Sequence, residues 1–343
     1  MSAKFFKPKS ILFFITIWVI IFGATEITLK MAGFGSQKTS IANPRFNVFQ
    51  ADPDLTWSLK ENWSGFEVNE APVSTNSINF RGEEPSSNHD FRILFLGDSV
   101  TYGHYLSNEE TIPFHLQKML SFEKKLRVEV LNAGVPGYST FQEEILFRLK
   151  GAKLNPKLVI LGFCLNDVTE RYSTVAAYGG SKFFLNVDTS ISLSPIKKIW
   201  QKTAIRETLV KILKISAKRG ENYRAEKLWK TPNASHIRQA WDVVFQELDL
   251  LAENLKEQGI KFIVVIFPYR VQLENYNQLN IPQMVLMEHL IRKRIPFLDL
   301  LPDLAQSKID PKLLYWDANH FNAFGAFIAS KHISNFLLKR KFL

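Results

Sequence analysis

The chain has 343 residues but only one cysteine, Cys164, so an intramolecular disulfide bond is impossible. Histidine, cysteine and acidic residues do not cluster with the spacing of a metal site, and we expect neither a metal nor another cofactor. Internal repeats are absent, and no nucleic-acid-binding module accompanies the basic residues, so nucleic acid is a poor candidate partner. Cys164 ends an apolar run, which is typical of a small buried side chain rather than of a nucleophile.

The composition is that of a globular protein, with 46% hydrophobic and 22% charged residues. This length is ample for one large α/β domain with a small appendage. The formal net charge is +10, and the basic residues gather near both ends and between Lys197 and Lys230. We interpret them as solvated faces, and the alternative is attraction to anionic lipid or to an acidic glycan.

The amino-terminal segment is apolar over residues 10–22, and extending it to Leu29 adds only one charged residue, Glu26. About 20 such residues span a bilayer, and the lysines that precede them favour a cytoplasmic start. A cleaved signal peptide is the alternative, but no convincing small-residue cleavage site follows. We therefore expect residues 1–34 to be an uncleaved transmembrane anchor, with the rest of the chain outside the cytoplasmic membrane.

Residues 35–90 are rich in Asn, Ser, Pro and Gly and show little periodicity beyond alternation near residues 55–59 and 65–68. This leader segment is either a stalk that folds back onto the following domain or a plain linker, and the sequence leaves both open.

From residue 91 to residue 343 apolar runs alternate with helical patterns. The runs are 93–96, 128–131, 158–163, 262–267 and 296–300. The helical patterns are 111–122, 141–150, 237–258, 283–293 and 322–338. Short runs buried on both faces are typical of parallel strands, and their alternation with helices predicts an α/β three-layer sandwich.

An insertion over residues 172–232 interrupts this alternation, starting loosely and becoming basic and amphipathic near residues 200–215. Loops that follow the carboxyl ends of strands shape binding sites, so the insertion is a candidate lid or acceptor-binding element. Its alternatives are a peripheral helix and a helix that lies on the membrane surface.

The chemistry-bearing residues lie in two places. Residues 92–103 form an apolar strand that ends in a tight turn carrying Ser99, and Asp317 and His320 lie three residues apart far downstream. A serine hydroxyl needs a base to become a nucleophile, and a carboxylate makes an imidazole a better base by fixing its tautomer. The G-x-S-x-G elbow of α/β-hydrolases is not met, because Thr101 replaces its last glycine.

Four short blocks in this order resemble the SGNH (GDSL) hydrolase family, and specifically its membrane-anchored bacterial members. The blocks are Gly97-Asp98-Ser99, Asn132-Ala-Gly-Val-Pro-Gly137-Tyr, Leu161-Gly-Phe-Cys-Leu-Asn166-Asp167 and Asp317-Ala-Asn-His320. The resemblance covers roughly residues 90–340. It implies a five-stranded parallel sheet in flavodoxin-like order and an esterase activity without a cofactor.

The resemblance also implies the roles of single residues. Ser99 would be the nucleophile, His320 the general base and Asp317 the residue that orients it. The oxyanion hole would consist of the Ser99 amide, the Gly137 amide and the side-chain amide of Asn166. Gly134 is the alternative donor. We prefer Gly137, because its spacing from Asn132 resembles the family's spacing between that asparagine and the donor glycine.

Several nearby residues have plainer interpretations. We interpret Asp98 as a turn stabiliser and Asp167 as a helix cap. The remaining histidines lack an acidic partner at the spacing of His320, so we treat them as structural or surface residues: His89, His104, His115, His236, His289 and His332.

The sequence favours an esterase that removes acetyl groups from a cell-envelope carbohydrate. One alternative is an acyltransferase with the same triad and a sugar hydroxyl as acceptor. Another is a catalytically silent module that binds glycan or serves as a scaffold, and a lipase or thioesterase acting at the membrane is also open. The expected partners are thus an acylated glycan or another ester substrate, and the membrane.

Overall fold

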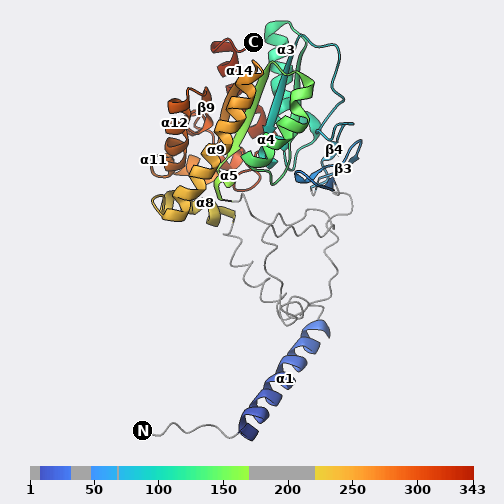
Figure 1. Cartoon of the computed structure of the whole chain (residues 1–343), viewed down its shortest axis with the longest axis vertical. Coiled ribbons are helices and arrows are strands. Elements are labelled where there is room, and N and C mark those ends of the chain that lie inside the picture. Colours follow the sequence, from blue (N-terminus) through green and yellow to red (C-terminus); the bar gives the residue numbers. More distant parts are fainter. Residues whose placement is uncertain (1–7, 32–47, 68, 170–220) are drawn as a thin grey trace. The chain divides into compact units, whose positions relative to one another are not determined.

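The computed structural model describes residues 8–31, 48–67, 69–169 and 221–343, which fall into two compact units (Figure 1). The described part of the smaller unit is helix α1 (Pro8–Met31), in which Glu26 and Lys30 form an ion pair of 3.1 Å one turn apart. The larger unit contains the sheet, its helices and residues 48–90.

The predicted membrane anchor corresponds to helix α1. Within the described ranges of the chain, no helix combines the length and the apolar character needed to cross a membrane. The transmembrane anchor expected over residues 1–34 stays a prediction.

The centre of the larger unit is a parallel sheet, as the alternation of apolar runs predicts. Within the described residues it has five strands in the order β6-β5-β7-β8-β9, which is the flavodoxin-like order. The strands are β5 (Phe91–Gly97), β6 (Val128–Gly134), β7 (Leu158–Cys164), β8 (Lys261–Phe267) and β9 (Phe297–Asp299). Nearly every residue of the first four is buried, which is why they read as continuous apolar runs.

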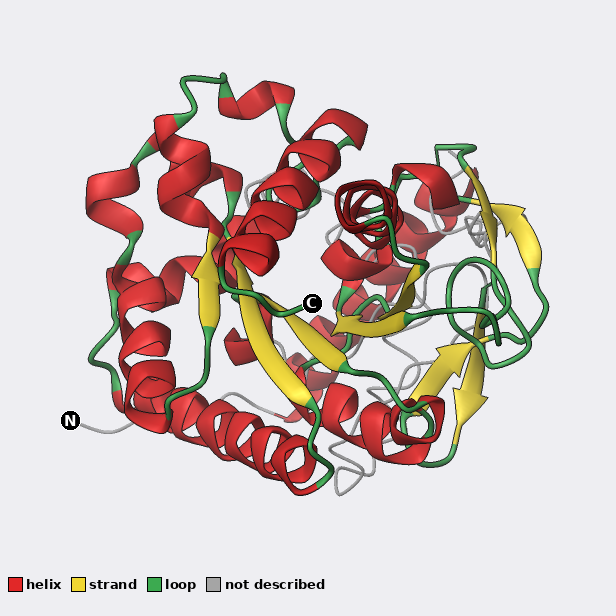
Figure 2. Cartoon of the chain, turned by 90° about the horizontal axis from the view of Figure 1, so that it is seen from above, coloured by secondary structure: helices red, strands yellow, loops and turns green. Residues whose placement is uncertain are grey.

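Helices cover both faces of this sheet (Figure 2). The long ones are α3 (Ile112–Lys124), α4 (Thr140–Leu149), α9 (Ser235–Glu257), α12 (Ile281–Lys293) and α14 (Ala323–Lys339). Helix α3 packs against β6 and α14, whereas α4 packs against β5 and α9. This arrangement confirms the α/β fold expected from the sequence.

Shorter helices lie at the strand ends and in the connections. They are α2 (Ser99–Tyr102), α5 (Asn166–Thr169), α8 (Glu221–Lys230), α10 (Arg270–Glu274), α11 (Tyr276–Leu279) and α13 (Leu300–Gln306), with 3₁₀ turns η1 (Asn108–Glu110), η2 (Gly151–Leu154) and η4 (Pro311–Leu313). Helices α2 and α5 follow directly after β5 and β7, so the first residue of each lies at the carboxyl edge of the sheet.

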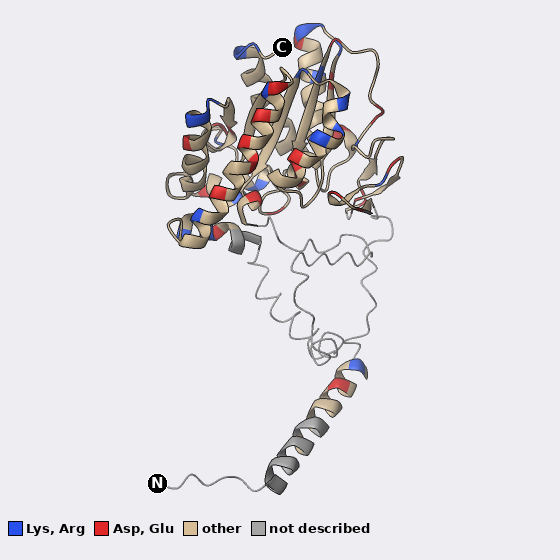
Figure 3. Ribbon diagram, in the orientation of Figure 1, with Lys and Arg blue, Asp and Glu red and all other residues tan. Residues whose placement is uncertain are grey.

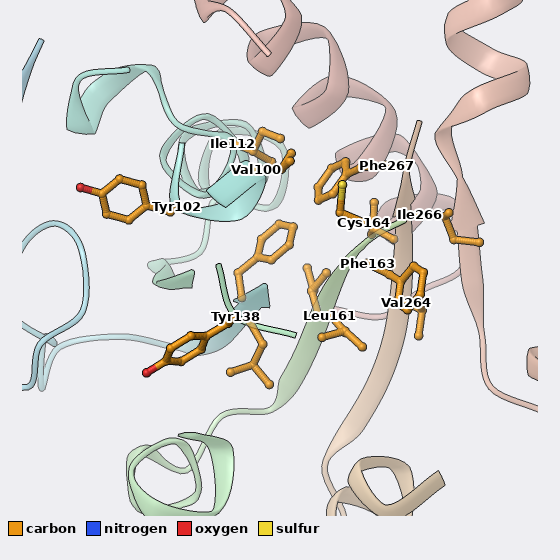
Figure 4. Close-up of a cluster of buried hydrophobic side chains, with 14 of the residues drawn as sticks. Val100, Tyr102, Ile112, Tyr138, Leu161, Phe163, Cys164, Val264, Ile266 and Phe267 are labelled. Atoms are coloured by element: carbon orange, nitrogen blue, oxygen red, sulfur yellow. The ribbon is translucent and has the colours of Figure 1, made fainter. Parts of the chain in front are cut away.

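The hydrophobic core lies between the strands and the helices that cover them, and Figure 4 shows part of it. Val100 and Tyr102 of α2 join it together with Leu161 and Phe163 of β7. Cys164 is fully buried, as expected for a small core residue, and burial raises the pKa of its thiol well above the ordinary value. The thiol therefore stays protonated and is a poor nucleophile.

The described part of the leader segment forms two antiparallel hairpins, β1 (Phe49–Asp52) with β2 (Thr56–Leu59) and β3 (Ser64–Phe66) with β4 (Pro72–Ser74). It packs against the sheet domain. The indole N–H of Trp57 donates to Pro136 O at 3.2 Å, and the Tyr138 hydroxyl donates to Trp57 O at 2.5 Å. Of the two interpretations of the leader, these contacts favour a segment that folds back onto the domain.

The insertion predicted over residues 172–232 lies mostly outside the described residues. Its last part is described and forms helix α8. Its proposed roles as a lid, a peripheral helix or a membrane-surface helix stay predictions. Basic and acidic residues both occur along the described part of the larger unit (Figure 3), and the basic residues at the carboxyl end, 339–341, are exposed as expected for a solvated face.

Candidate active site

The nucleophile candidate lies on a sharp turn at the carboxyl end of β5. Gly97 has φ +155°, and a Cβ atom there would come within 2.1 Å of Thr101 Oγ1, so the turn requires glycine. Asp98 then caps α2, because its Oδ1 accepts a hydrogen bond from Val100 N at 2.8 Å. Ser99 is the first residue of that helix, where its hydroxyl can reach side chains from other loops.

The structure brings together the three residues that the sequence predicts for the triad. Ser99 Oγ lies 2.8 Å from His320 Nε2, and His320 Nδ1 lies 2.7 Å from Asp317 Oδ2. The other carboxylate oxygen, Asp317 Oδ1, accepts from the backbone N–H of His320 at 2.9 Å and from that of Asn319 at 3.1 Å. Both carboxylate oxygens thus fix the position of the imidazole.

The carboxylate of Asp317 is held in its ionised form. Partial burial alone would raise its pKa, but the hydrogen bonds and the charge interaction with His320 outweigh burial, and the pKa falls to about 2. An ionised Asp317 accepts the Nδ1 proton of His320 and leaves Nε2 as the acceptor that faces Ser99.

Asn166 lies beside the nucleophile, at the start of α5 directly after β7. Its Nδ2 donates to Asp98 Oδ2 at 2.8 Å, and the Ser99 hydroxyl contacts the same oxygen at 3.5 Å. Asp98 is fully buried, and burial raises its pKa although the hydrogen bonds from Asn166 and Val100 oppose the shift. The interpretation of Asp98 as a turn stabiliser is therefore incomplete, because its carboxyl group also links Asn166 to the nucleophile turn.

The two glycines considered for the oxyanion hole differ in their surroundings. The Gly134 N–H donates to Asn132 Oδ1 at 3.1 Å, and a Cβ atom on Gly134 would meet Tyr102 N at 2.2 Å. Gly134 is thus occupied in packing β6 against α2. Gly137 lies in the following loop with φ +83°, and in the described part of the chain its N–H has no acceptor. Gly137 therefore remains the better candidate for the donor, and its role stays a prediction.

A small pocket lies beside Ser99 and His320, and the rings of Tyr105 and Trp316 lie near His320 without lining that pocket. The pocket is lined by Ser99, Gly103, His104, Leu106, His320 and Phe321. The ring of Tyr105 lies 5.7 Å from that of His320 and 6.1 Å from that of Trp316, whose side chain is 55% exposed. The residue that follows the triad histidine, Phe321, thus forms part of the pocket wall.

His104 is a site residue that sequence reasoning missed. We expected a structural or surface histidine, but its buried ring lies 5.1 Å from the His320 ring, and its Nδ1 lies 3.0 Å from the buried carboxylate of Glu67. The position of His104 only five residues after Ser99 could have marked it as a site residue. Its contact with Glu67 could not be predicted, because Glu67 belongs to the leader segment and lies far from His104 in the sequence.

Other histidines also have acidic partners that come from distant positions. His289 Nε2 lies 2.8 Å from Asp249 Oδ1, and His332 Nδ1 lies 3.3 Å from Asp303 Oδ2. Among the described residues no serine contact is seen at either pair, and the interpretation of these histidines as structural or surface residues stays a prediction. The described ranges also contain no group of three or more His, Cys, Asp and Glu side chains arranged to hold a metal ion.

Comparison with known proteins gives a family and a set of similar folds. The model of the GDSL-like lipase/acylhydrolase family matches residues 95–326, which is more than half of the chain. A comparison with curated proteins found no match.

Similar solved structures include a catalytic mutant of Axe2, an acetylxylan esterase from Geobacillus stearothermophilus. It is 12% identical, with 72% of this chain and 94% of that chain covered and a TM-score of 0.45. A two-domain esterase active on acetylated mannans is 13% identical over 73% of this chain and 49% of that chain, with a TM-score of 0.44. These are similarities only, and the assignment depends on the family model and on the fold. The chain belongs to the GDSL-like lipase/acylhydrolase family and is an SGNH-type hydrolase that acts on ester bonds.

Proposed function

We propose that this protein is a serine esterase that removes O-acyl groups, chiefly acetyl, from a cell-envelope carbohydrate through an acyl-enzyme. The observation that carries the proposal is the continuous contact from Ser99 to His320 to Asp317, with distances of 2.8 and 2.7 Å. This is the geometry in which a base can take the hydroxyl proton as the oxygen attacks a carbonyl carbon.

In the first step His320 Nε2 takes the proton of Ser99 Oγ while the oxygen attacks the ester carbonyl. The carbonyl oxygen becomes negative and accepts hydrogen bonds from the Ser99 N–H, the Gly137 N–H and the Asn166 amide. One such donor typically stabilises the transition state by about 2.7–4 kcal/mol. Protonated His320 then gives its proton to the leaving alkoxide, which leaves as an alcohol.

In the second step His320 acts as a base again and takes a proton from water, whose oxygen attacks the acyl-enzyme. The acid is released, and Ser99 regains its proton. Asp317 stays ionised throughout, since its pKa of about 2 keeps it charged at neutral pH. An acyltransferase would differ only in this step, with a sugar hydroxyl in place of water.

Two features support a carbohydrate substrate. The exposed ring of Trp316 and the ring of Tyr105 offer flat apolar faces beside His320, which suits the carbon-bound faces of a sugar ring. The amino-terminal sequence supports a location outside the cytoplasmic membrane, where envelope glycans lie, and this location is part of the proposal.

The test measures acetate released from p-nitrophenyl acetate and from acetylated polysaccharide by the full-length chain. We expect release from both, and loss of both activities in Ser99→Ala. Ser121→Ala is the matched control, because that serine bonds to Val128 at the far end of β6. Activity that survives in Ser99→Ala contradicts the assigned nucleophile. Acetate transfer to an added oligosaccharide in place of acetate release would identify the acyltransferase.

A further inference from the structure

A buried arginine of the leader segment contacts the turn that follows the nucleophile helix. Arg81 is 3% exposed. Its Nη1 donates to Tyr102 O at 3.0 Å and to Gly103 O at 2.9 Å, and its Nη2 donates to Leu106 O. Its Nε donates to Asn108 Oδ1 at 3.0 Å. One guanidinium group therefore satisfies three backbone carbonyl groups within five consecutive residues.

Helix α2 depends on such contacts because it has only four residues. A helix this short is not stable by itself. The carbonyl groups at its carboxyl end receive no hydrogen bond from an N–H group of the helix, so they need donors from elsewhere. Asp98 satisfies the amino end of α2, and a positive guanidinium group at the carboxyl end complements the helix dipole. The Arg81 guanidinium also lies over the Tyr102 ring, 4.4 Å from its centroid (Figure 4 shows Tyr102).

The turn held by Arg81 carries two of the rings that surround the general base. The His104 ring lies 5.1 Å from the His320 ring, and the Tyr105 ring lies 5.7 Å from it. The leader segment also contributes Glu67, whose carboxylate lies 3.0 Å from His104 Nδ1. A shift of this turn would therefore move Ser99 on one side and the neighbours of His320 on the other.

We propose that Arg81 is a positioning residue for the Ser99–His320 pair, and that the leader segment is a working part of the active site. This inference rests on the proposed function. Arg81 touches neither reacting atom but fixes the helix and the turn that place them. Because small displacements of reacting groups have large effects on rate, the loss of Arg81 should lower turnover more than it weakens substrate binding.

The chain offers a matched control in Arg92, which is also a buried arginine. It is 9% exposed, and its guanidinium donates to Leu154 O, to Ser86 O and to the carboxylate of Glu129. Arg92 lies near the amino end of β5, roughly 16 Å along the strand from Gly97, which is the last residue of β5 before the turn into α2. Its replacement should affect stability without affecting the placement of Ser99.

The experiment compares Arg81→Lys and Arg92→Lys in the full-length chain. For each variant kcat and KM for p-nitrophenyl acetate and the rate of labelling by a fluorophosphonate are measured well below the unfolding temperature. Arg81→Lys should lose about 10–100-fold in kcat and in labelling rate, with KM changed less than about threefold. Arg92→Lys should keep kcat within about twofold. Guanidinium ion at millimolar concentration should partly restore the activity of Arg81→Ala.

The outcomes separate the two claims. If the wild type is active and Arg81→Lys has the same kcat and the same labelling rate, the positioning role is contradicted but the proposed function is not. Equal losses of kcat in the folded Arg81→Lys and Arg92→Lys also contradict it, because they indicate a general effect of lost stability. A wild type that neither hydrolyses nor labels contradicts the proposed function and the positioning role with it. If Arg81→Lys does not fold, Asn108→Ala removes one of its acceptors, and an unchanged kcat in that variant overturns the role.

Discussion

The carboxylate of Asp317 contacts His320 at two points, with Oδ1 2.9 Å from the backbone nitrogen and Oδ2 2.7 Å from ring Nδ1. A single side chain thus fixes both the backbone and the ring of the general base. Because the pKa of Asp317 is about 2, the carboxylate remains an acceptor at every pH at which the protein would ordinarily act. The second ring nitrogen, Nε2, is then directed at Ser99.

Replacing Asp317 by Asn should leave the fold intact and remove the acceptor that selects the His320 tautomer. We expect kcat for an acetyl ester to fall by about 10⁴-fold, as for other triads with this change. Steady-state kinetics at neutral pH measures the effect. The matched control is Asp249→Asn, because Asp249 also accepts from a buried histidine, His289, at 2.8 Å. A similar loss in both variants would contradict the specific role of Asp317.

Asn166→Ala should remove one donor to the oxyanion and leave the carboxyl group of Asp98 without its amide partner. We expect kcat to fall by about 10²–10³-fold with little change in KM, since the hydrogen bond strengthens only as charge develops. Asn254→Ala is the control, because the amide of Asn254 on α9 donates to the carboxylate of Glu144 on α4 at 2.8 Å. An Asn166→Ala variant that raises KM and keeps kcat would place this amide in substrate binding instead.

The free energy of unfolding should fall as the pH rises above the ordinary range of carboxyl groups. Glu143 and Asp167 are fully buried, and burial raises the pKa of both well above the ordinary value, with the charges of neighbouring acids adding to the shift. The native state therefore keeps protons that the unfolded chain has lost, so stability decreases with pH over that interval and is fully present below it. Glu143→Gln should make the decrease shallower.

Urea unfolding between pH 5 and pH 9 measures this slope. The control is Glu253→Gln, because that glutamate is exposed on α9 and its replacement should leave the slope as it is in the wild type. An unchanged slope in Glu143→Gln would show that this carboxyl group is ionised in the folded protein.

Gly134→Ala should disturb the nucleophile helix directly. The new methyl group would lie 2.2 Å from Tyr102 N and 2.8 Å from Tyr102 Cα, and backbone atoms cannot give way as a flexible side chain does. We expect the free energy of unfolding to fall by about 1–3 kcal/mol and kcat to fall with it, because α2 must move. Thermal unfolding and kinetics on the same preparation check both effects. A fully stable and active Gly134→Ala would contradict the close packing of β6 on α2.

The triad was predictable because each of its parts lies in a short local pattern. Ser99 follows a buried strand directly, and Asp317 and His320 lie on one tight turn. The sheet was predictable for a similar reason, since buried parallel strands read as apolar runs. The fifth strand was the least accurate. The run 296–300 predicts a strand, and β9 spans Phe297–Asp299, but Asp299 accepts from Leu301 N at 3.0 Å and caps helix α13, so the strand ends one residue earlier than the run.

The contributions of the leader segment could not be predicted, because they depend on long-range contacts. Arg81 satisfies carbonyl groups more than 20 positions away, and the partner of His104 is Glu67, which directly follows β3 in the leader segment. No local pattern marks either residue. The short helices α10 and α11 were also missed, since four or five residues are too few to show a helical period.

Activation of the Ser99 hydroxyl by His320 can be measured by covalent labelling of the serine. The full-length protein is treated with a fluorophosphonate, digested, and the modified residue is identified by mass spectrometry. We expect one modified residue, Ser99, with labelling abolished in Ser99→Ala and slowed at least 100-fold in Asp317→Asn. Modification of another residue, or no modification of the folded wild type, would contradict it.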